Sequence, residues 1–147
     1  FDVTSEVLKE VFTELNNQKV ALNGIVLKPN MVISGMDAAN RADIPTVASA
    51  TVKCLSENVP DEVPGIAFLS GGQTSEEATG HLNAMNEMGP HPWQLTFSYG
   101  RALQAEPLNA WSGEDENIPA AQESFIKRSR LNSLARTGNY HPQMEEA

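Results

Sequence analysis

Three short apolar segments alternate with longer segments whose apolar residues recur at helical spacing. The apolar segments cover residues 25–28, 63–70 and 92–102, and a stretch that predicts a helix follows each of them. One more amphipathic helix opens the chain. Strands that alternate with helices are joined by right-handed crossovers and pair in parallel. The sequence therefore predicts an α/β fold with a parallel sheet.

Capping residues indicate where these helices begin. Asp2 or Thr4 is suited to cap the first helix, and Asp43 to cap the helix that follows the first strand. Thr74 and Glu77 have the spacing of a capping box at the start of the next helix. Two later helices are expected, a short one ending near Trp111 and a final one from near Pro119 to Gly138.

The number of predicted strands is small for this many helices. A barrel of eight strand–helix units takes about 250 residues, whereas this chain has 147. We therefore expect the chain to be part of a barrel whose other strands lie outside it, rather than a complete domain.

Composition excludes some functions. The chain is 40% hydrophobic and 20% charged, as globular proteins are, and its net charge of −9 argues against nucleic-acid binding through the overall field. A single cysteine, Cys54, excludes an internal disulfide and fits a reducing compartment. No apolar run approaches the roughly 20 residues that span a bilayer. The opening "FDVTSEVLKE" predicts an amphipathic helix rather than a signal peptide.

The unusual residues of the chain follow the three predicted strands. Lys28 ends the first, "SGG" at 70–72 follows the second, and "SYGR" at 98–101 follows the third. Chemistry in parallel α/β sheets gathers at the carboxyl ends of the strands. By contrast, His81, His91 and His141 are scattered without the spacing of metal ligands, so no metal site is expected.

Both glycine-bearing turns are candidates for phosphate binding. Glycines between a strand and a helix let the backbone approach a ligand, and a helix amino terminus favours an anion. Ser70 adds a hydroxyl to the first turn, and Arg101 adds a planar set of donors to the second. The alternatives are a tight turn that uses glycine for geometry only, and a surface arginine paired with a carboxylate.

Lys28 is the candidate nucleophile. An amine in an apolar pocket near other cations has a lowered pKa and attacks carbonyl groups, and the resulting imine withdraws electrons from a neighbouring carbon–carbon bond. The alternative is a lysine at a strand end whose amine simply reaches water. Pro29, which fixes the direction in which the chain leaves the strand, fits both interpretations.

Four segments of the chain together closely resemble class I fructose-1,6-bisphosphate aldolases. They are "GIVLKPNMV", "VPGIAFLSGGQTSEEA", "PWQLTFSYGRALQ" and "AAQESFIKRSRLNSLARTGNY", in the same order and spacing. The resemblance implies an α/β (β/α)8 TIM barrel, of which this chain would supply about strands 6 to 8 with their helices. Residues 1–138 would be the C-terminal part of that single domain, and residues 139–147 a truncated, flexible tail.

The resemblance also implies an activity. It is the reversible cleavage of fructose 1,6-bisphosphate to dihydroxyacetone phosphate and glyceraldehyde 3-phosphate in glycolysis and gluconeogenesis, by a cytoplasmic homotetrameric lyase without metal or other cofactor. A plastid form would carry a transit peptide upstream of Phe1. Lys28 matches the lysine that forms the family's Schiff base. The residues that match its phosphate-binding turns are Leu69, Ser70, Gly71, Ser98, Tyr99, Gly100 and Arg101.

The chain departs from the family in what it lacks. The family's acid–base carboxylates and other active-site lysines lie on earlier strands, so these 147 residues alone are expected to be inactive. The chain does not reach the family's terminal tyrosine, and Tyr140 matches an earlier one. Two alternatives stay open: an aldolase that prefers fructose 1-phosphate, and a scaffolding protein that keeps the fold without catalysis.

Overall fold

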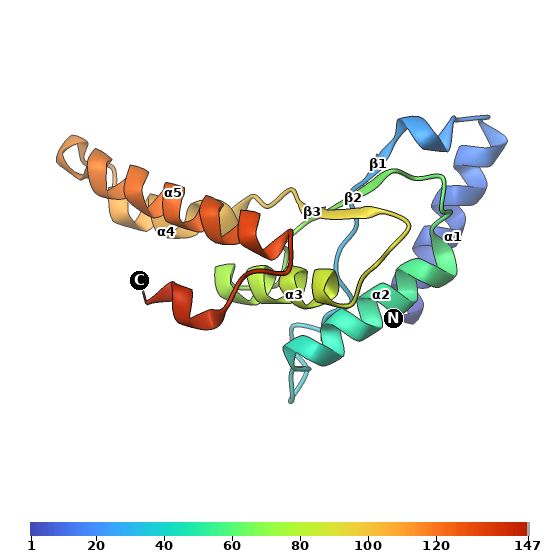
Figure 1. Ribbon diagram of the computed structural model, residues 1–147, viewed down its shortest axis with the longest axis horizontal. Coiled ribbons are helices and arrows are strands. Elements are labelled where there is room, and N and C mark those ends of the chain that lie inside the picture. Colours follow the sequence, from blue (N-terminus) through green and yellow to red (C-terminus); the bar gives the residue numbers. More distant parts are fainter. Residues whose placement is uncertain (147) are drawn as a thin grey trace.

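The structure is a computed structural model that describes residues 1–146, and within them strands and helices alternate along the chain (Figure 1). No helix of this part is long and apolar enough to cross a membrane. Three short 3-10 helices are η1 (Leu22–Gly24), η2 (Asp115–Asn117) and η3 (Pro142–Glu145). The other elements are α1 (Asp2–Asn17), β1 (Val26–Leu27), α2 (Ile44–Asn58), β2 (Gly65–Phe68), α3 (Ser75–Glu87), β3 (Gln94–Phe97), α4 (Arg101–Trp111) and α5 (Ile118–Ala135).

The strands form one parallel sheet in the order β1-β2-β3. Leu27 lies opposite Ile66 and Ile66 opposite Leu95, so the sheet is in register across all three strands. Helices α2 and α3 lie together on one side of it (Figure 1). This arrangement confirms the α/β fold and the parallel pairing predicted from the alternation of strands and helices.

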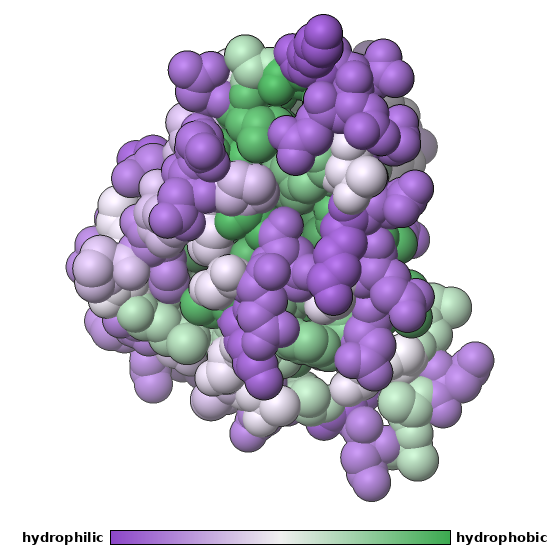
Figure 2. Space-filling view, turned by 90° about the vertical axis from the view of Figure 1, so that its right-hand side faces the viewer, coloured by the Kyte–Doolittle hydropathy of each residue, from purple (hydrophilic) through white to green (hydrophobic). Residues whose placement is uncertain are grey.

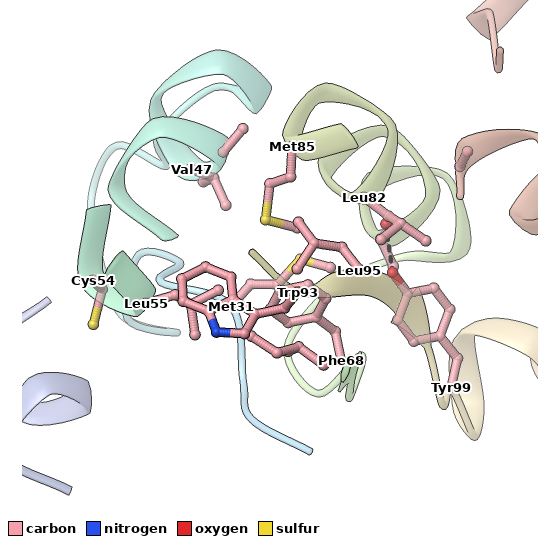
Figure 3. Close-up of a cluster of buried hydrophobic side chains, with 14 of the residues drawn as sticks. Met31, Val47, Cys54, Leu55, Phe68, Leu82, Met85, Trp93, Leu95 and Tyr99 are labelled. Carbon is pink, nitrogen blue, oxygen red and sulfur yellow. Dashed lines mark hydrogen bonds between the residues drawn. The ribbon is translucent and has the colours of Figure 1, made fainter. Parts of the chain in front are cut away.

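The core lies between the sheet and this pair of helices. Ile66 and Phe68 on β2 have no exposed surface, and Trp93, which is 3% exposed, reaches between α2 and α3 (Figure 3). The indole N–H of Trp93 donates to the Pro60 carbonyl at 3.0 Å, which satisfies its one polar group inside the core. Cys54 on α2 is also fully buried. It therefore packs as a small core residue.

Local capping signals place two helix starts correctly. The Asp43 carboxylate accepts a hydrogen bond from the Thr46 amide at 3.0 Å at the start of α2. At the start of α3, the Thr74 hydroxyl accepts from the Glu77 amide and the Glu77 carboxylate accepts from the Thr74 amide, at 3.1 and 2.9 Å. Both caps confirm the prediction, because each depends on residues within one turn of the helix.

Several boundaries differ from the prediction. Strands β1 and β2 are shorter than the apolar segments 25–28 and 63–70, and α5 ends at Ala135 rather than at Gly138. Helix α1 begins one residue earlier than expected, with Phe1 at its N-cap and no side-chain cap, so neither Asp2 nor Thr4 caps it. Strand β3 is also shorter than the apolar segment 92–102, since it ends at Phe97. The backbone of Gly100, at φ −91° and ψ −85°, already turns the chain into α4.

The described chain leaves apolar side chains exposed on several elements, among them α1 and β1. Val3, Val7 and Val11 are 74%, 56% and 38% exposed along one face of α1, and Val26 on β1 is 64% exposed. Figure 2 views the molecule from the α1 side and shows hydrophobic groups between hydrophilic ones. A stripe of valines on a helix and an uncovered strand residue are what a barrel presents when its neighbouring units are taken away.

A buried guanidinium joins the end of the described chain to α4 and α5. Arg128 on α5 is 2% exposed and donates to both carboxylate oxygens of Glu145 at 2.8 and 2.9 Å and to Glu106 of α4 at 2.9 Å. The hydroxyl of Tyr140, itself 4% exposed, donates to Glu145 at 2.8 Å. This packed arrangement differs from the tail expected at residues 139–147. The flexibility of that segment stays a prediction, and Ala147 lies outside the described residues.

We expect Arg128→Met to lower the free energy of unfolding by about 3 kcal/mol, because it leaves the largely buried Glu145 carboxylate without its main partner. Glu106→Gln should cost less than about 1 kcal/mol, since the Glu106 side chain is 43% exposed and water can replace the pair. Urea unfolding of the two variants measures the difference. Equal losses would contradict the view that burial decides the strength of this network.

Candidate active site

The hydrogen bonds of the sheet continue past the strand ends. The Leu69 amide donates to the Pro29 carbonyl at 3.0 Å, and the Ser98 amide donates to the Phe68 carbonyl at 2.8 Å. The segments that follow β1, β2 and β3 therefore lie side by side at one edge of the sheet. This edge carries the predicted lysine and both glycine-bearing turns, so the structure brings the three sequence features together.

Strand alternation sets which side of the sheet each residue faces. Leu27 is paired with the fully buried Ile66, so Lys28 faces the opposite side, which α2 and α3 do not cover. By the same alternation, Leu69 and Ser98 face the same side of the sheet as Lys28. Lys28 and Ser98 are exposed and Leu69 is half-buried. The Lys28 amine thus belongs to the open side of the sheet, which is the inside of a barrel when the sheet closes.

Ser70 links the two glycine-bearing turns. It is 6% exposed, and its hydroxyl oxygen accepts a hydrogen bond from the Ala102 amide at 3.4 Å in the first turn of α4. A hydroxyl that accepts one bond keeps its own proton for a second partner. Ser70 can therefore hold α4 against the first turn and still donate to an anion between the two turns.

Gly72 is required by the shape of its turn. Its φ is +79°, a conformation that side chains rarely adopt, and a Cβ placed there would lie 2.9 Å from Cδ1 of Ile33. The glycine at this position therefore serves backbone geometry. This part of the "SGG" motif fits the tight-turn alternative, whereas Ser70 and Gly71 are the residues left to contact a ligand.

The two helices that follow the turns differ at their amino termini. The amides of Thr74 and Glu77 at the start of α3 are already taken by the capping box. Helix α4 has no side-chain cap at Gly100, and a Cβ added there would have nothing within 4 Å. The Ala102 amide meets the Ser70 hydroxyl, but no capping-box side chains take up the start of α4. Helix α4 is therefore the better candidate for an anion than α3.

Arg101 is the cation closest along the chain to that open helix terminus. Its side chain is exposed, and within residues 1–146 the ion pairs involve other basic residues, namely Arg41, Lys53 and Arg128. The pairing of Arg101 with a surface carboxylate, which the sequence left open, is not seen in this part of the chain. Its guanidinium is available to an anion bound at the start of α4.

Tyr99 points away from this open edge. Its ring is 6% exposed, and its hydroxyl donates to the Ala78 carbonyl of α3 at 2.8 Å (Figure 3). Burial raises the pKa of this phenol, so the group stays a neutral donor. Only the backbone of Tyr99 is available to a ligand between the turns, and its assignment as a phosphate-binding residue stays a prediction.

Two further side chains, Arg41 and His81, contact the turn that follows β2. Nη2 of Arg41 donates to the Gly72 carbonyl at 2.8 Å, and Nδ1 of His81 lies 2.7 Å from Oε1 of Gln73. Neither contact could be predicted from a sequence pattern, because Arg41 belongs to an irregular loop and His81 to a helix face with no recognisable motif. Within residues 1–146, no three His, Cys, Asp or Glu side chains are arranged to hold a metal ion.

An amine and two glycine-bearing turns at the carboxyl edge of a parallel sheet are typical of a segment of an α/β barrel with a candidate ligand site. Comparisons with known proteins place this segment. The family model "Fructose-bisphosphate aldolase class-I" matches residues 1–147. The chain therefore belongs to the class-I fructose-bisphosphate aldolase family, which confirms the resemblance seen in its motifs.

Individual relatives agree with the family model. The chain is 55% identical over 139 residues to fructose-bisphosphate aldolase B of Gallus gallus and 49% identical over 138 residues to fructose-bisphosphate aldolase of Plasmodium falciparum (isolate K1 / Thailand). Each match covers 94% of this chain. The chain spans only about 38% of the length of these relatives.

A solved structure extends the likeness to the fold. A crystal structure of Plasmodium falciparum fructose-bisphosphate aldolase, in complex with TRAP and a small-molecule inhibitor, superposes with a TM-score of 0.91 at 49% identity. The match covers 95% of this chain and 40% of that chain. The three-stranded sheet and its helices are thus the C-terminal part of a TIM barrel, as the sequence predicted.

Burial of His81 predicts a dependence of stability on pH. Burial lowers the pKa of its imidazole below the ordinary 6.5, so the unfolded chain binds this proton more readily, and stability falls as pH drops from about 7.5 to about 5.5. We expect His81→Gln to lose less stability over this range, measured as the urea midpoint. His141→Gln, at an exposed position, is the control and should behave as the wild type. Equal pH slopes for all three proteins would count against the buried imidazole.

Proposed function

We propose that this chain is the C-terminal part of a lyase that reversibly cleaves fructose 1,6-bisphosphate to dihydroxyacetone phosphate and glyceraldehyde 3-phosphate. The reaction serves glycolysis and gluconeogenesis and proceeds through a Schiff base on Lys28. The observation that carries the proposal is the position of Lys28 on the open side of the sheet, in line with both glycine-bearing turns. Membership of the class-I aldolase family supports it.

Binding of the substrate begins at its C1 phosphate. In this proposal the Ser70 hydroxyl, the Gly71 amide, the Gly100 amide and the Arg101 guanidinium donate to that phosphate. The backbone of Leu69, Ser98 and Tyr99 completes the two turns, which Ser70 and Ala102 join. A phosphate held there brings the C2 ketone towards the Lys28 amine. Fixing one end of the substrate lowers the entropy cost of forming the covalent bond.

The covalent steps use the amine as a nucleophile and its imine as an electron sink. Nζ of Lys28 attacks C2, and loss of water gives the protonated imine. The C4 hydroxyl then gives up its proton and the C3–C4 bond breaks, so that C4 to C6 leave as glyceraldehyde 3-phosphate. The electron pair of that bond forms the C2–C3 double bond of an enamine, and the imine π pair moves to nitrogen. Protonation of C3 and hydrolysis release dihydroxyacetone phosphate. Because the imine accepts the electrons, the proposed reaction uses neither a metal nor another cofactor.

The acid–base groups for these proton transfers come from outside this chain. Lys28 is exposed in residues 1–146, so the strands that complete the barrel must supply both its desolvation and its catalytic carboxylates. The chain by itself is therefore inactive in this proposal.

The proposal includes the setting in which the enzyme works. We place it in the cytoplasm as a homotetramer that acts on phosphorylated sugars and binds neither nucleic acid nor membrane. The net charge of −9 supports the exclusion of nucleic acid as a partner. Sizing of the full-length protein and its distribution after cell fractionation test the assembly and the compartment.

Borohydride trapping tests the Schiff base directly. We expect incubation of the full-length protein with dihydroxyacetone phosphate and borohydride to add a reduced adduct to the peptide that contains Lys28. Lys28→Met should abolish the adduct and lower kcat by about 10³-fold or more, because the covalent nucleophile is lost. Lys53→Met, which removes an exposed lysine of α2, is the matched control. A full-length protein without an adduct at Lys28 would favour the scaffolding alternative.

Arg101 is expected to contribute substrate affinity. Arg101→Gln removes a charge-assisted hydrogen bond to phosphate and should raise KM for fructose 1,6-bisphosphate roughly 10- to 100-fold. Arg136→Gln changes an exposed arginine beyond α5 and should leave KM unaltered. Comparing kcat/KM for fructose 1,6-bisphosphate and fructose 1-phosphate in the same assay decides between the two substrate preferences. An unchanged KM in Arg101→Gln would remove this residue from the phosphate site.

A further inference from the structure

The loop that follows β1 wraps around the turn that follows β2. We call residues 33–42 the Arg41 loop and residues 70–74 the phosphate turn. Cδ1 of Ile33 lies against Gly72, where a Cβ would come within 2.9 Å. The Ala42 amide donates to the Ser34 hydroxyl at 2.9 Å, which closes the Arg41 loop on itself. The loop is thus closed by a hydrogen bond between its two ends, next to the phosphate turn.

Arg41 makes the polar contacts between these two segments. Its Nη2 donates to the Gly72 carbonyl at 2.8 Å and lies 3.7 Å from Oε2 of Glu77. The same Glu77 oxygen accepts from the Thr74 amide at 2.9 Å. One guanidinium therefore touches the middle of the phosphate turn and the carboxylate that caps its end. Hydrogen bonds from a charged donor are stronger than those between neutral groups.

The Gly72 carbonyl, which Arg41 contacts, belongs to the one residue of residues 70–74 with a positive φ. Glycine has more accessible backbone conformations than any other residue, and Gly72 sits at a φ of +79°. Rotation of the peptide group after Gly72 would carry the preceding residues of the turn with it. A partner on this carbonyl limits that rotation and keeps Ser70 and Gly71 in place.

The same loop leads back to the nucleophile. Between Lys28 and Ile33 the chain is held by the Leu69 amide on the Pro29 carbonyl at 3.0 Å and by the Val32 amide on the Thr51 hydroxyl at 2.9 Å. Arg41 therefore lies at the C-terminal end of a segment that begins at Lys28. Its hydrogen bond to Gly72 links this segment to the phosphate turn.

We propose that Arg41 is a positioning residue for the phosphate turn. The inference rests on the function proposed for Lys28, Ser70 and Gly71. Arg41 does not touch the reacting atoms. It holds the Gly72 carbonyl, so that the Ser70 hydroxyl and the Gly71 amide meet the substrate phosphate without first having to be ordered. Loss of Arg41 weakens the binding of phosphate-bearing substrate and leaves the cleavage of bound substrate nearly unchanged.

Kinetics of the full-length protein provide the first test. Arg41→Ala should raise KM for fructose 1,6-bisphosphate and Ki for inorganic phosphate about 5- to 10-fold, with kcat within about 2-fold. Arg41→Lys, which keeps the charge and one donor, should restore most of the affinity. Arg136→Ala is the matched control at another exposed arginine. A fall in kcat with KM and Ki unchanged would overturn the proposal.

Hydrogen exchange provides a readout that does not depend on catalysis. Peptides that cover residues 69–74 should exchange faster in Arg41→Ala than in the wild type or in Arg136→Ala, while peptides from α5 stay unchanged. Unchanged exchange in residues 69–74 would overturn the proposal. So would faster exchange with unchanged KM and Ki, which would make Arg41 a structural contact only. Absence of aldolase activity in the wild type would instead refute the proposed function, and the exchange result would still show whether Arg41 holds the turn.

Discussion

The backbone hydrogen bonds that extend beyond the strands are the constraint on which the candidate site depends. Leu69 to Pro29 and Ser98 to Phe68 keep three chain segments in register after the regular strands have ended. Each of these segments contributes a different group: an amine, a hydroxyl with a glycine amide, and an open helix terminus with an arginine. Without this shared register the three groups would follow independent loops, and no single substrate could reach all of them.

Helices α3 and α4, which follow the two glycine-bearing turns, differ in how the amide groups at their amino termini are satisfied. Helix α3 satisfies its first amides with its own Thr74 and Glu77, so its amino terminus is a stable end that also receives Arg41. Helix α4 has Gly100 at its N-cap, which provides no side-chain cap, and Ser70 meets only the Ala102 amide. A self-capped helix gives rigidity, and an uncapped one gives donors for an anion. Ser70 lies between these two helix starts. The candidate site therefore has a rigid turn on the α3 side and amide donors on the α4 side.

Features that depend on neighbouring residues were predictable from the sequence, and those that depend on the packed core were not. The cap at Asp43 and the box at Thr74 need only local spacing, and the match of Lys28 to the family's Schiff-base lysine rests on the short motif around it. The direction of the Tyr99 side chain could not be read from "SYGR", because it is set by a cavity against Ala78 on a distant helix. Arg41 was missed for the same reason, since its partner Gly72 lies 31 positions further along the chain.

The sheet has a consequence for handling this polypeptide on its own. Within residues 1–146, β1 and β3 are each paired on one side only, and the face that bears Val26 carries no helix. Unpaired strand edges beside exposed apolar surface are templates for association with other chains. The isolated segment is thus prone to aggregate. In a closed barrel, the neighbouring strands and helices of the same chain pair with these edges and cover this surface, which prevents such association.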